Sequence, residues 1–210
     1  MVFLILSIIC SVSVGVIFKI ARRYTVNIPQ IVTANYFLAL VLCYIFFRPD
    51  LIAVQTDAPW GIYISLGILL PAIFLILAAS IKYMGIVKTD AAQRLSLFIP
   101  ILAAWLLFGE KFNTLKITAF LIAFPALLLI LNKPSDNTKN KWIYPAFVLV
   151  GFGLIDILFK QIALFTNLPY TTSLFVVFGL ALLLMAAVVG FEMVFKKAQL
   201  NYKNFLLGCL

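Results

Sequence analysis

The chain contains no histidine and only three cysteines, and only 11% of its 210 residues are charged. Without histidine, an enzyme lacks the commonest general base and a metal site lacks the commonest ligand. The three cysteines (Cys10, Cys43 and Cys209) lie in apolar sequence without metal-ligand spacing, which predicts small core residues. A glycine-rich phosphate loop, paired carboxylates and a nucleophile elbow are also missing from the sequence. We therefore expect neither an enzyme nor a protein that holds a metal or another cofactor.

The small charged fraction goes with a large fraction of apolar residues. Soluble domains carry about 25% charged residues, whereas this chain is 65% hydrophobic and has a mean hydropathy of +1.15. A spanning helix needs about 20 mostly apolar residues. Seven runs meet this requirement, at residues 2–20, 28–47, 60–81, 91–108, 115–131, 142–165 and 171–195. An eighth run opens at Asn204, so we expect an all-α, polytopic helical membrane protein in the lipid bilayer of the cell (inner) membrane.

The net charge of +9 comes from cations that are dispersed over short loops. A dispersed pattern does not favour nucleic acid as a partner. Eleven cations lie in the loops after the first, third, fifth and seventh runs, and three lie in the loops on the opposite side. The positive-inside rule then places the odd-numbered loops in the cytoplasm and the N-terminus outside. The first run lacks a basic flank and a cleavage site, which predicts a retained helix and not a signal peptide.

The sequence repeats itself with an offset of 140 or 141 residues. The segments that occur twice are Phe18-Lys19 with Phe159-Lys160, Asn27-Ile28-Pro29 with Asn167-Leu168-Pro169, and Leu66-Gly67 with Leu207-Gly208. A duplication with an odd number of spans in each copy predicts two repeats of inverted orientation. We expect a five-helix repeat over residues 1–132, a loop over 133–141 and the start of a second, incomplete repeat over 142–210.

A motif in the fourth run carries a family resemblance. A stretch rich in threonine and alanine begins at Thr89, Pro100 lies within the apolar run, and Gly109-Glu110-Lys111 follows it before the fifth run. This pattern resembles the EamA-type half of the drug/metabolite transporter superfamily, over all of the first repeat and the start of the second. The resemblance implies ten helices in two inverted repeats, a cytoplasmic N-terminus in conflict with the charge count, and transport of small metabolites. By this comparison the chain stops before helices eight to ten.

Two further features of the runs concern their shape and not their chemistry. Pro71, Pro100 and Pro125 are each expected to interrupt a span near its middle, which frees backbone carbonyls and allows bending. Glu110 ends the fourth run beside a lysine at the water interface, where a carboxylate costs little. We expect Pro100, Gly109 and Glu110 to form a structural motif, in which Glu110 positions the loop.

Polar residues inside apolar runs are the candidates for a site, because a charge at a helix centre costs roughly 2.5–3.5 kcal/mol on insertion scales. Asp156 lies nine residues before the end of its run, about 13 Å at 1.5 Å per residue. It either pairs with Lys160 on the same helical face or serves as a substrate or proton site. Lys19 and Lys160 correspond in the two copies and are expected to face a central cavity, although snorkelling alone would explain Lys19.

Four more residues complete the predicted set. Arg94 either pairs with Asp90 or, with Gln93, offers planar donors to a carboxylate or phosphate. Asn35 and Tyr36 either bond to a neighbouring helix or contact a substrate. Because cations outnumber Asp156 in this set, we predict a secondary transporter of a small anionic or zwitterionic metabolite, an exporter that works by alternating access. The alternative is a non-transporting membrane protein, either a lipid-handling subunit or a truncated structural remnant, and nothing in the sequence points to a particular oligomeric state.

Overall fold

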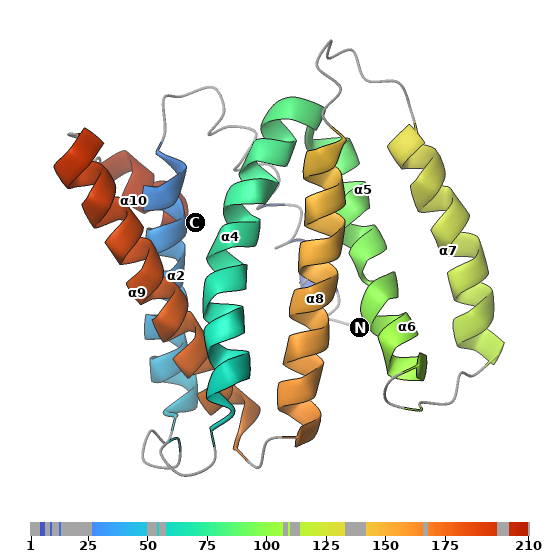
Figure 1. The fold of residues 1–210 in the computed structure, drawn as a ribbon, viewed down its shortest axis with the longest axis horizontal. Helices are drawn as coiled ribbons and strands as arrows, with labels where there is room; N and C mark the ends of the chain where they lie inside the picture. The colour runs from blue at the N-terminus through green and yellow to red at the C-terminus, as the bar shows by residue number, and fades with distance from the viewer. Residues whose placement is uncertain are drawn as a thin grey trace. The chain divides into compact units, whose positions relative to one another are not determined.

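The structure, a computed structural model, is all-helical over the part of the chain that it describes (Figure 1). It describes residues 27–49, 58–106, 114–132, 142–165, 168–196 and 202–209, and residues 5, 6, 9, 13, 54 and 109 singly. The helices are α2 (Ile28–Phe47), α4 (Trp60–Met84), α5 (Ile86–Ser96), α6 (Phe98–Leu106), α7 (Thr114–Asn132), α8 (Ile143–Phe165), α9 (Tyr170–Lys196) and α10 (Tyr202–Cys209). Four of them, α2, α4, α8 and α9, are long and apolar enough to cross a bilayer. The predicted polytopic helical membrane protein is confirmed.

Most of the apolar runs give helices close to their predicted ends. The run 28–47 coincides with α2, and the ends of α4, α7, α8 and α9 differ from the prediction by at most three residues. The run that opens at Asn204 lies in α10, whereas most of the first run lies outside the described residues. Trp60 begins α4 and Trp142 directly precedes α8, as expected of aromatic anchors at the membrane surface.

The fourth run, predicted over 91–108, is the exception, because it is divided between two helices near Pro100, where an interruption was predicted. The structure has α5 and α6 in its place, with a break at Leu97. Pro100 lacks the backbone N–H that would bond to the carbonyl of Ser96, so a regular helix loses support at this point. The backbone N–H of Leu97 instead bonds to the carbonyl of Arg94 at 3.2 Å. The Ser96 hydroxyl donates to a neighbouring carbonyl, that of Gln93, which stabilises the tightened turn.

The other two prolines do not interrupt their spans, contrary to the prediction. Pro71 lies inside α4 and Pro125 inside α7, and both helices are continuous through them. The chain instead turns at Gly85, where φ is 84°, a backbone conformation that residues other than glycine rarely adopt. Helix α5 therefore begins at Ile86, five residues earlier than the predicted run.

The start of α2 shows why the Asn-x-Pro sequence precedes a helix. The Asn27 side chain accepts a hydrogen bond from the backbone N–H of Gln30 at 3.4 Å and so caps the helix. Pro29 lies in the first turn, where a missing N–H has no effect because no carbonyl requires it. At the other end, Arg48 has a left-handed conformation with φ of 43°, and its N–H bonds to the carbonyl of Tyr44 at 3.1 Å. Local sequence thus defines both ends of this span.

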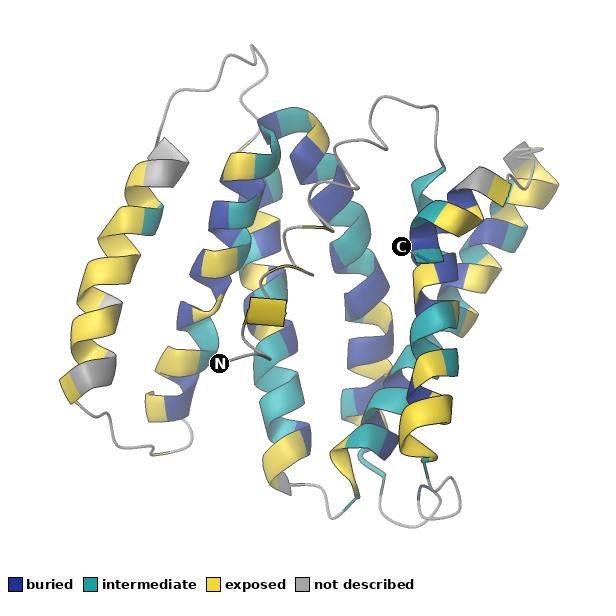
Figure 2. Ribbon diagram, turned by 180° about the vertical axis from the view of Figure 1, so that it is seen from behind, coloured by how far each residue is buried: buried dark blue, intermediate teal, exposed yellow. Residues whose placement is uncertain are grey.

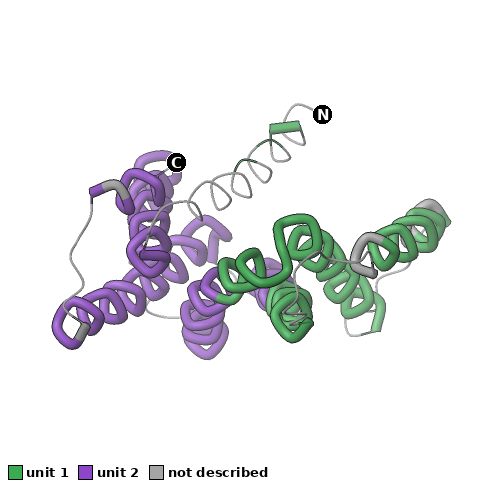
Figure 3. Tube along the Cα trace, turned by 90° about the horizontal axis from the view of Figure 1, so that it is seen from above, with its two compact units in different colours: residues 1–26, 76–154 green, residues 27–75, 155–210 purple. Residues whose placement is uncertain are grey.

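The chain forms two compact units (Figure 3). Unit 1 comprises residues 1–26 and 76–154, and unit 2 comprises residues 27–75 and 155–210. Helices α4 and α8 each contribute one part to each unit. In unit 1, α5 packs against α6 and α7. In unit 2, α2 packs against both α9 and α10.

Two glycines allow close helix packing in unit 2. A Cβ atom on Gly67 of α4 would lie 2.8 Å from the Cβ atom of Leu180 on α9. A Cβ atom on Gly208 of α10 would collide with the carbonyl oxygen of Ile31 and lie 2.7 Å from the Cβ atom of Ala34, both on α2. Lipid provides no hydrophobic driving force between helices, so small residues that permit close van der Waals contact stabilise the packing.

Apolar side chains remain on the outer surfaces of the helices. Helix α7 is exposed along most of its length (Figure 2). Ile122 and Leu129 on this helix are each 74% exposed. Such surfaces fit the hydrocarbon of a bilayer, in which apolar groups need no cover.

Candidate functional site

Tyr36 is the most unusual polar residue of unit 2. Its side chain is 2% exposed, and its hydroxyl has no hydrogen-bond partner among the described residues. Its ring lies 6.1 Å from that of Phe74 on α4 and 6.2 Å from that of Phe178 on α9. A buried hydroxyl without a partner costs about 1–3 kcal/mol. Three helices therefore enclose a hydroxyl that has no partner among the described residues.

Asn35 does not share this position with its neighbour. It is exposed, whereas Tyr36 is buried. Successive residues of an α-helix project about 100° apart because one turn takes 3.6 residues. The structure therefore separates these two predicted site residues.

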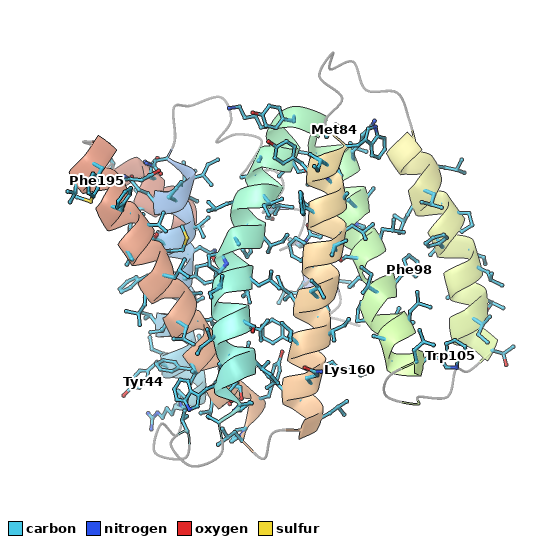
Figure 4. The ribbon with its side chains drawn as sticks, viewed as in Figure 1. Tyr44, Met84, Phe98, Trp105, Lys160 and Phe195 are labelled. Atoms are coloured by element: carbon cyan, nitrogen blue, oxygen red, sulfur yellow. The ribbon has the colours of Figure 1, made fainter. Side chains whose placement is uncertain are left out.

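Asp156 and Lys160 lie on the part of α8 that belongs to unit 2. Both are half-buried, and Figure 4 shows Lys160 on the lower part of the helix. The Asp156 carboxyl interacts electrostatically with Tyr170, the first residue of α9. The ring of Phe159, also on α8, lies 6.3 Å from the Tyr170 ring. Asp156 and Lys160 are thus partly enclosed side chains beside the start of α9.

Gln93 and Arg94 lie in unit 1, in the last turn of α5. The Arg94 guanidinium pairs with Asp90 through a 2.8 Å contact from Nε to Oδ2, with side chains that are 45% and 46% exposed. This ion pair is one of the two alternatives that were predicted for Arg94 from the sequence. Gln93 is half-buried, and its carbonyl accepts the Ser96 hydroxyl. Both residues directly precede the helix break.

The four remaining predicted residues are Lys19, Pro100, Gly109 and Glu110. Lys19 and Glu110 lie outside the described residues. Gly109 has φ of 63°, so glycine suits the turn that follows α6. Pro100 lies in the first turn of α6, just after the break at Leu97.

Sequence reasoning missed two buried hydrogen bonds that join helices of unit 2. The Tyr63 hydroxyl of α4 lies 2.8 Å from the Ser173 hydroxyl of α9. The Asn204 amide of α10 donates to the Gln30 side chain of α2 over 2.7 Å. All four side chains are less than 9% exposed. Each bond therefore lies in the interior of unit 2.

One residue of each bond occupies a corresponding place in the sequence. Tyr63 and Asn204 are 141 positions apart, which is the offset of the internal repeat. Each is followed four positions later by one of the close-packing glycines, Gly67 or Gly208. The repeat offset could have identified these two residues from the sequence. They were missed because tyrosine and asparagine are different residue types.

The two bonds lie at opposite ends of unit 2. The Tyr63 bond is in the first turns of α4 and α9, whereas the Asn204 bond is in the first turns of α10 and α2. The start of α2 meets the end of α9, because the Asn27 amide donates to the Glu192 carboxylate over 3.0 Å. Helices α2 and α9 therefore run antiparallel, and their starts lie at opposite ends of the unit (Figure 1).

Tyr36 lies between these two bonds. It is six residues after Gln30 on α2, about 9 Å along the helix at 1.5 Å per residue. Its contact Phe178 is five residues after Ser173 on α9, about 7.5 Å along that helix. Unit 2 therefore has an unsatisfied hydroxyl in its middle and a polar contact between helices at each end.

Comparison with known proteins places the chain in a family. The sequence profile of the EamA-like transporter family matches residues 1–132. The chain belongs to the EamA-like transporter family. It is similar to a protein of Haemophilus influenzae that bears the name "Uncharacterized protein", with 39% identity over an alignment of 217 positions that covers 98% of this chain and 72% of the relative. No solved structure matches the chain.

Membership of this family agrees with the apolar helices. The chain is a multi-pass integral membrane protein and a membrane transporter of the drug/metabolite type. The predicted family resemblance is confirmed over residues 1–132. Members of the family are transporters and not enzymes, and a small-molecule substrate follows from the same membership.

Proposed function

We propose that the chain is a secondary transporter that exports a small anionic or zwitterionic metabolite by alternating access. Family membership supports transport, and the observation that carries the mechanism is the pair of buried hydrogen bonds at the two ends of unit 2. Alternating access requires that contacts close one side of a central site while the other side opens. Tyr63 with Ser173, and Asn204 with Gln30, are contacts of the kind required.

The proposed substrate contacts are the buried hydroxyl of Tyr36 and the charged and polar residues that the sequence singles out. We assign Tyr36 to the substrate as a hydrogen-bond donor, since its hydroxyl lacks a partner among the described residues. Lys160, Lys19, Arg94 and Gln93 add cationic or polar donors, which favour a substrate with a carboxylate or phosphate. Asp156 would bind the amine of a zwitterion or a coupled proton, and Asn35 would take part only if the exposed side of α2 meets the substrate path.

The two inverted repeats are part of the same proposal. We infer that residues 1–132 form the first repeat, 133–141 a loop and 142–210 the beginning of the second. The matching positions of Tyr63 and Asn204 support this division. With the odd-numbered loops in the cytoplasm, as the charge count indicates, the Asn204 bond closes the cytoplasmic side and the Tyr63 bond closes the outer side.

The experiment is uptake into proteoliposomes of a panel of radiolabelled amino acids, carboxylic acids and sugar phosphates. The protein should transport at least one anionic or zwitterionic compound above empty vesicles. The substitution Tyr36→Phe should lower that rate about tenfold or more, because a hydrogen bond to a charged group contributes about 1.5–3 kcal/mol. It should leave thermal stability unchanged or raised, since the deleted hydroxyl has no protein partner among the described residues.

The matched control is Tyr44→Phe, which deletes a hydroxyl from the same helix at a residue that is 57% exposed. This variant should keep the parent rate. A full rate in Tyr36→Phe would remove Tyr36 from the substrate site. Failure of every anionic and zwitterionic compound in the panel would contradict the proposed substrate class, whatever the behaviour of the variants.

A further inference from the structure

Unit 1 contains an apolar groove that the transport proposal does not use. It has a volume of about 480 Å³ and lies between α5, α7 and α8. Its walls include Ala92 and Leu95 of α5, Leu128 of α7, and Trp142, Ala146 and Leu149 along α8 and its start. The volume is within the range of small-molecule sites, about 300–1,000 Å³. None of the lining residues carries a charge.

A buried cation adjoins one end of this groove. Lys88 is 7% exposed, and its Nζ lies 4.8 Å from the ring centroid of Trp142, which lines the groove. Lys88 is four residues before Ala92 and seven before Leu95, so the three side chains share one face of α5. No carboxylate pairs with Lys88 among the described residues, and the nearest acid in the sequence, Asp90, pairs with Arg94.

The groove therefore changes from charged to apolar along its length. From Lys88 to Leu95 on α5, and from Trp142 to Leu149 on α8, the chain advances seven residues, about 10 Å at 1.5 Å per residue. A buried cation without a counter-ion is costly, and an anion beside it would offset that cost. An anionic group attached to an apolar chain matches both parts of the groove.

Since α8 is long and apolar enough to span a membrane, phospholipid is the amphiphile available to this groove. Trp142 fits the depth of the phospholipid phosphates, because tryptophans are enriched at the membrane–water interface. Lys88 belongs to the set of loop cations that the charge count assigns to the cytoplasm, where membrane lipids are anionic. We propose that unit 1 binds one anionic phospholipid, with its phosphate at Lys88 and an acyl chain in the groove.

Quenching of Trp142 fluorescence by brominated lipid tests the site. The chain has three tryptophans, so Trp60→Phe with Trp105→Phe leaves Trp142 as the sole indole. This parent is reconstituted in vesicles that contain brominated phosphatidylglycerol or, in a second series, brominated phosphatidylcholine at matched mole fractions. Brominated phosphatidylglycerol should quench Trp142 at a mole fraction about fivefold lower than brominated phosphatidylcholine. This ratio corresponds to about 1 kcal/mol, the attraction of one lysine to an anionic lipid surface.

Three variants separate this site from general attraction of anionic lipid. Lys88→Gln should abolish the preference for phosphatidylglycerol. Lys82→Gln makes the same charge change at an exposed lysine whose Nζ lies 5.8 Å from the Tyr83 ring, and it should keep the preference. Ala146→Phe fills the groove from an exposed wall position without a change of charge, and should reduce quenching by both lipids.

Equal quenching by the two lipids in the parent would overturn the proposal, as would a full preference in Lys88→Gln. If Lys88→Gln does not fold, undiminished quenching in Ala146→Phe would overturn it equally. Absence of quenching by either lipid would show that protein covers the groove. None of these outcomes depends on transport, so the lipid site and the transport proposal succeed or fail separately.

Discussion

The two ends of unit 2 are alike in position but differ in chemistry. At one end the hydroxyls of Tyr63 and Ser173 meet at 2.8 Å, and the Cys43 thiol donates weakly to a backbone carbonyl of α9 over 3.7 Å. At the other end the amides of Asn204 and Gln30 meet at 2.7 Å, and a further amide donates to the Glu192 carboxylate over 3.0 Å. A bond to a carboxylate is stronger than a bond between neutral groups.

This difference indicates that the end with Asn204 holds its helices together more firmly. Hydrogen bonds between membrane helices contribute about 0.6 kcal/mol on average and up to about 1.7 kcal/mol. The bond to the Glu192 carboxylate, which has only a weak thiol contact as its counterpart at the other end, therefore favours closure of the Asn204 end by about 1 kcal/mol. A difference of this size leaves the opposite arrangement accessible, as alternating access requires.

Close packing at the two glycines should give the largest difference between the ends. Gly208→Ala places a Cβ atom against the Ile31 backbone carbonyl, which cannot move away easily, whereas Gly67→Ala meets the Leu180 side chain. Overpacking costs about 1–3 kcal/mol, and we expect Gly208→Ala to be the more destabilising. Thermal unfolding in mild detergent measures both.

Gly190→Ala is the matched control, since a Cβ atom there meets nothing within 4 Å. It should stabilise the protein by about 0.5–1 kcal/mol, because alanine favours a helix over glycine. If Gly208→Ala unfolds at the same temperature as Gly190→Ala, the close approach of α10 to α2 does not exist.

Removal of the hydrogen bonds themselves should have a smaller effect. Tyr63→Phe and Asn204→Leu each delete one bond between helices, so each should lower stability by about 0.6–1.7 kcal/mol. Ser65→Ala is a suitable control, since this exposed hydroxyl donates within its own helix, to the carbonyl of Gly61 at 2.7 Å. A loss in Ser65→Ala as large as in the other two would show that the measured effect does not report on contacts between helices.

The exposed ion pair of unit 1 should matter least for stability. Arg94→Gln breaks the contact with Asp90, and both side chains are nearly half exposed. Exposed pairs contribute about 0–1 kcal/mol, so the melting temperature should barely change. A loss larger than that of Asn204→Leu would contradict the importance given to buried neutral pairs. A loss of transport with unchanged stability would support Arg94 as a substrate contact.

The sequence predicts most helices well because apolar length alone decides where a chain crosses lipid. An interruption was predicted at Pro100 but equally at Pro71 and Pro125, because three prolines in apolar runs look alike. Of the three, only Pro100 lies beside a helix break. Its effect depends on whether nearby groups, here the Ser96 hydroxyl, stabilise a turn. Composition does not contain that information.

The site was predictable only in part. Polarity within apolar sequence identified Tyr36, but it equally selected Asn35, which the helical turn places on an exposed side. Tyr63 and Asn204 were missed because their side chains differ, although their spacing equals the repeat offset. Which polar groups meet across helices depends on packing, and the two glycines that permit it carry no polar group of their own.

The most direct test of alternating ends is a pair of distances measured by dipolar electron paramagnetic resonance. Spin labels at Phe46 and Trp60 report the end with Tyr63, and labels at Val194 and Tyr202 report the end with Asn204; all four residues are exposed. The native cysteines are replaced by alanine in both doubly labelled proteins. We predict that Tyr63→Phe lengthens only the first distance and Asn204→Leu lengthens only the second. Lengthening of both distances by either substitution, or of neither by both, would contradict the account.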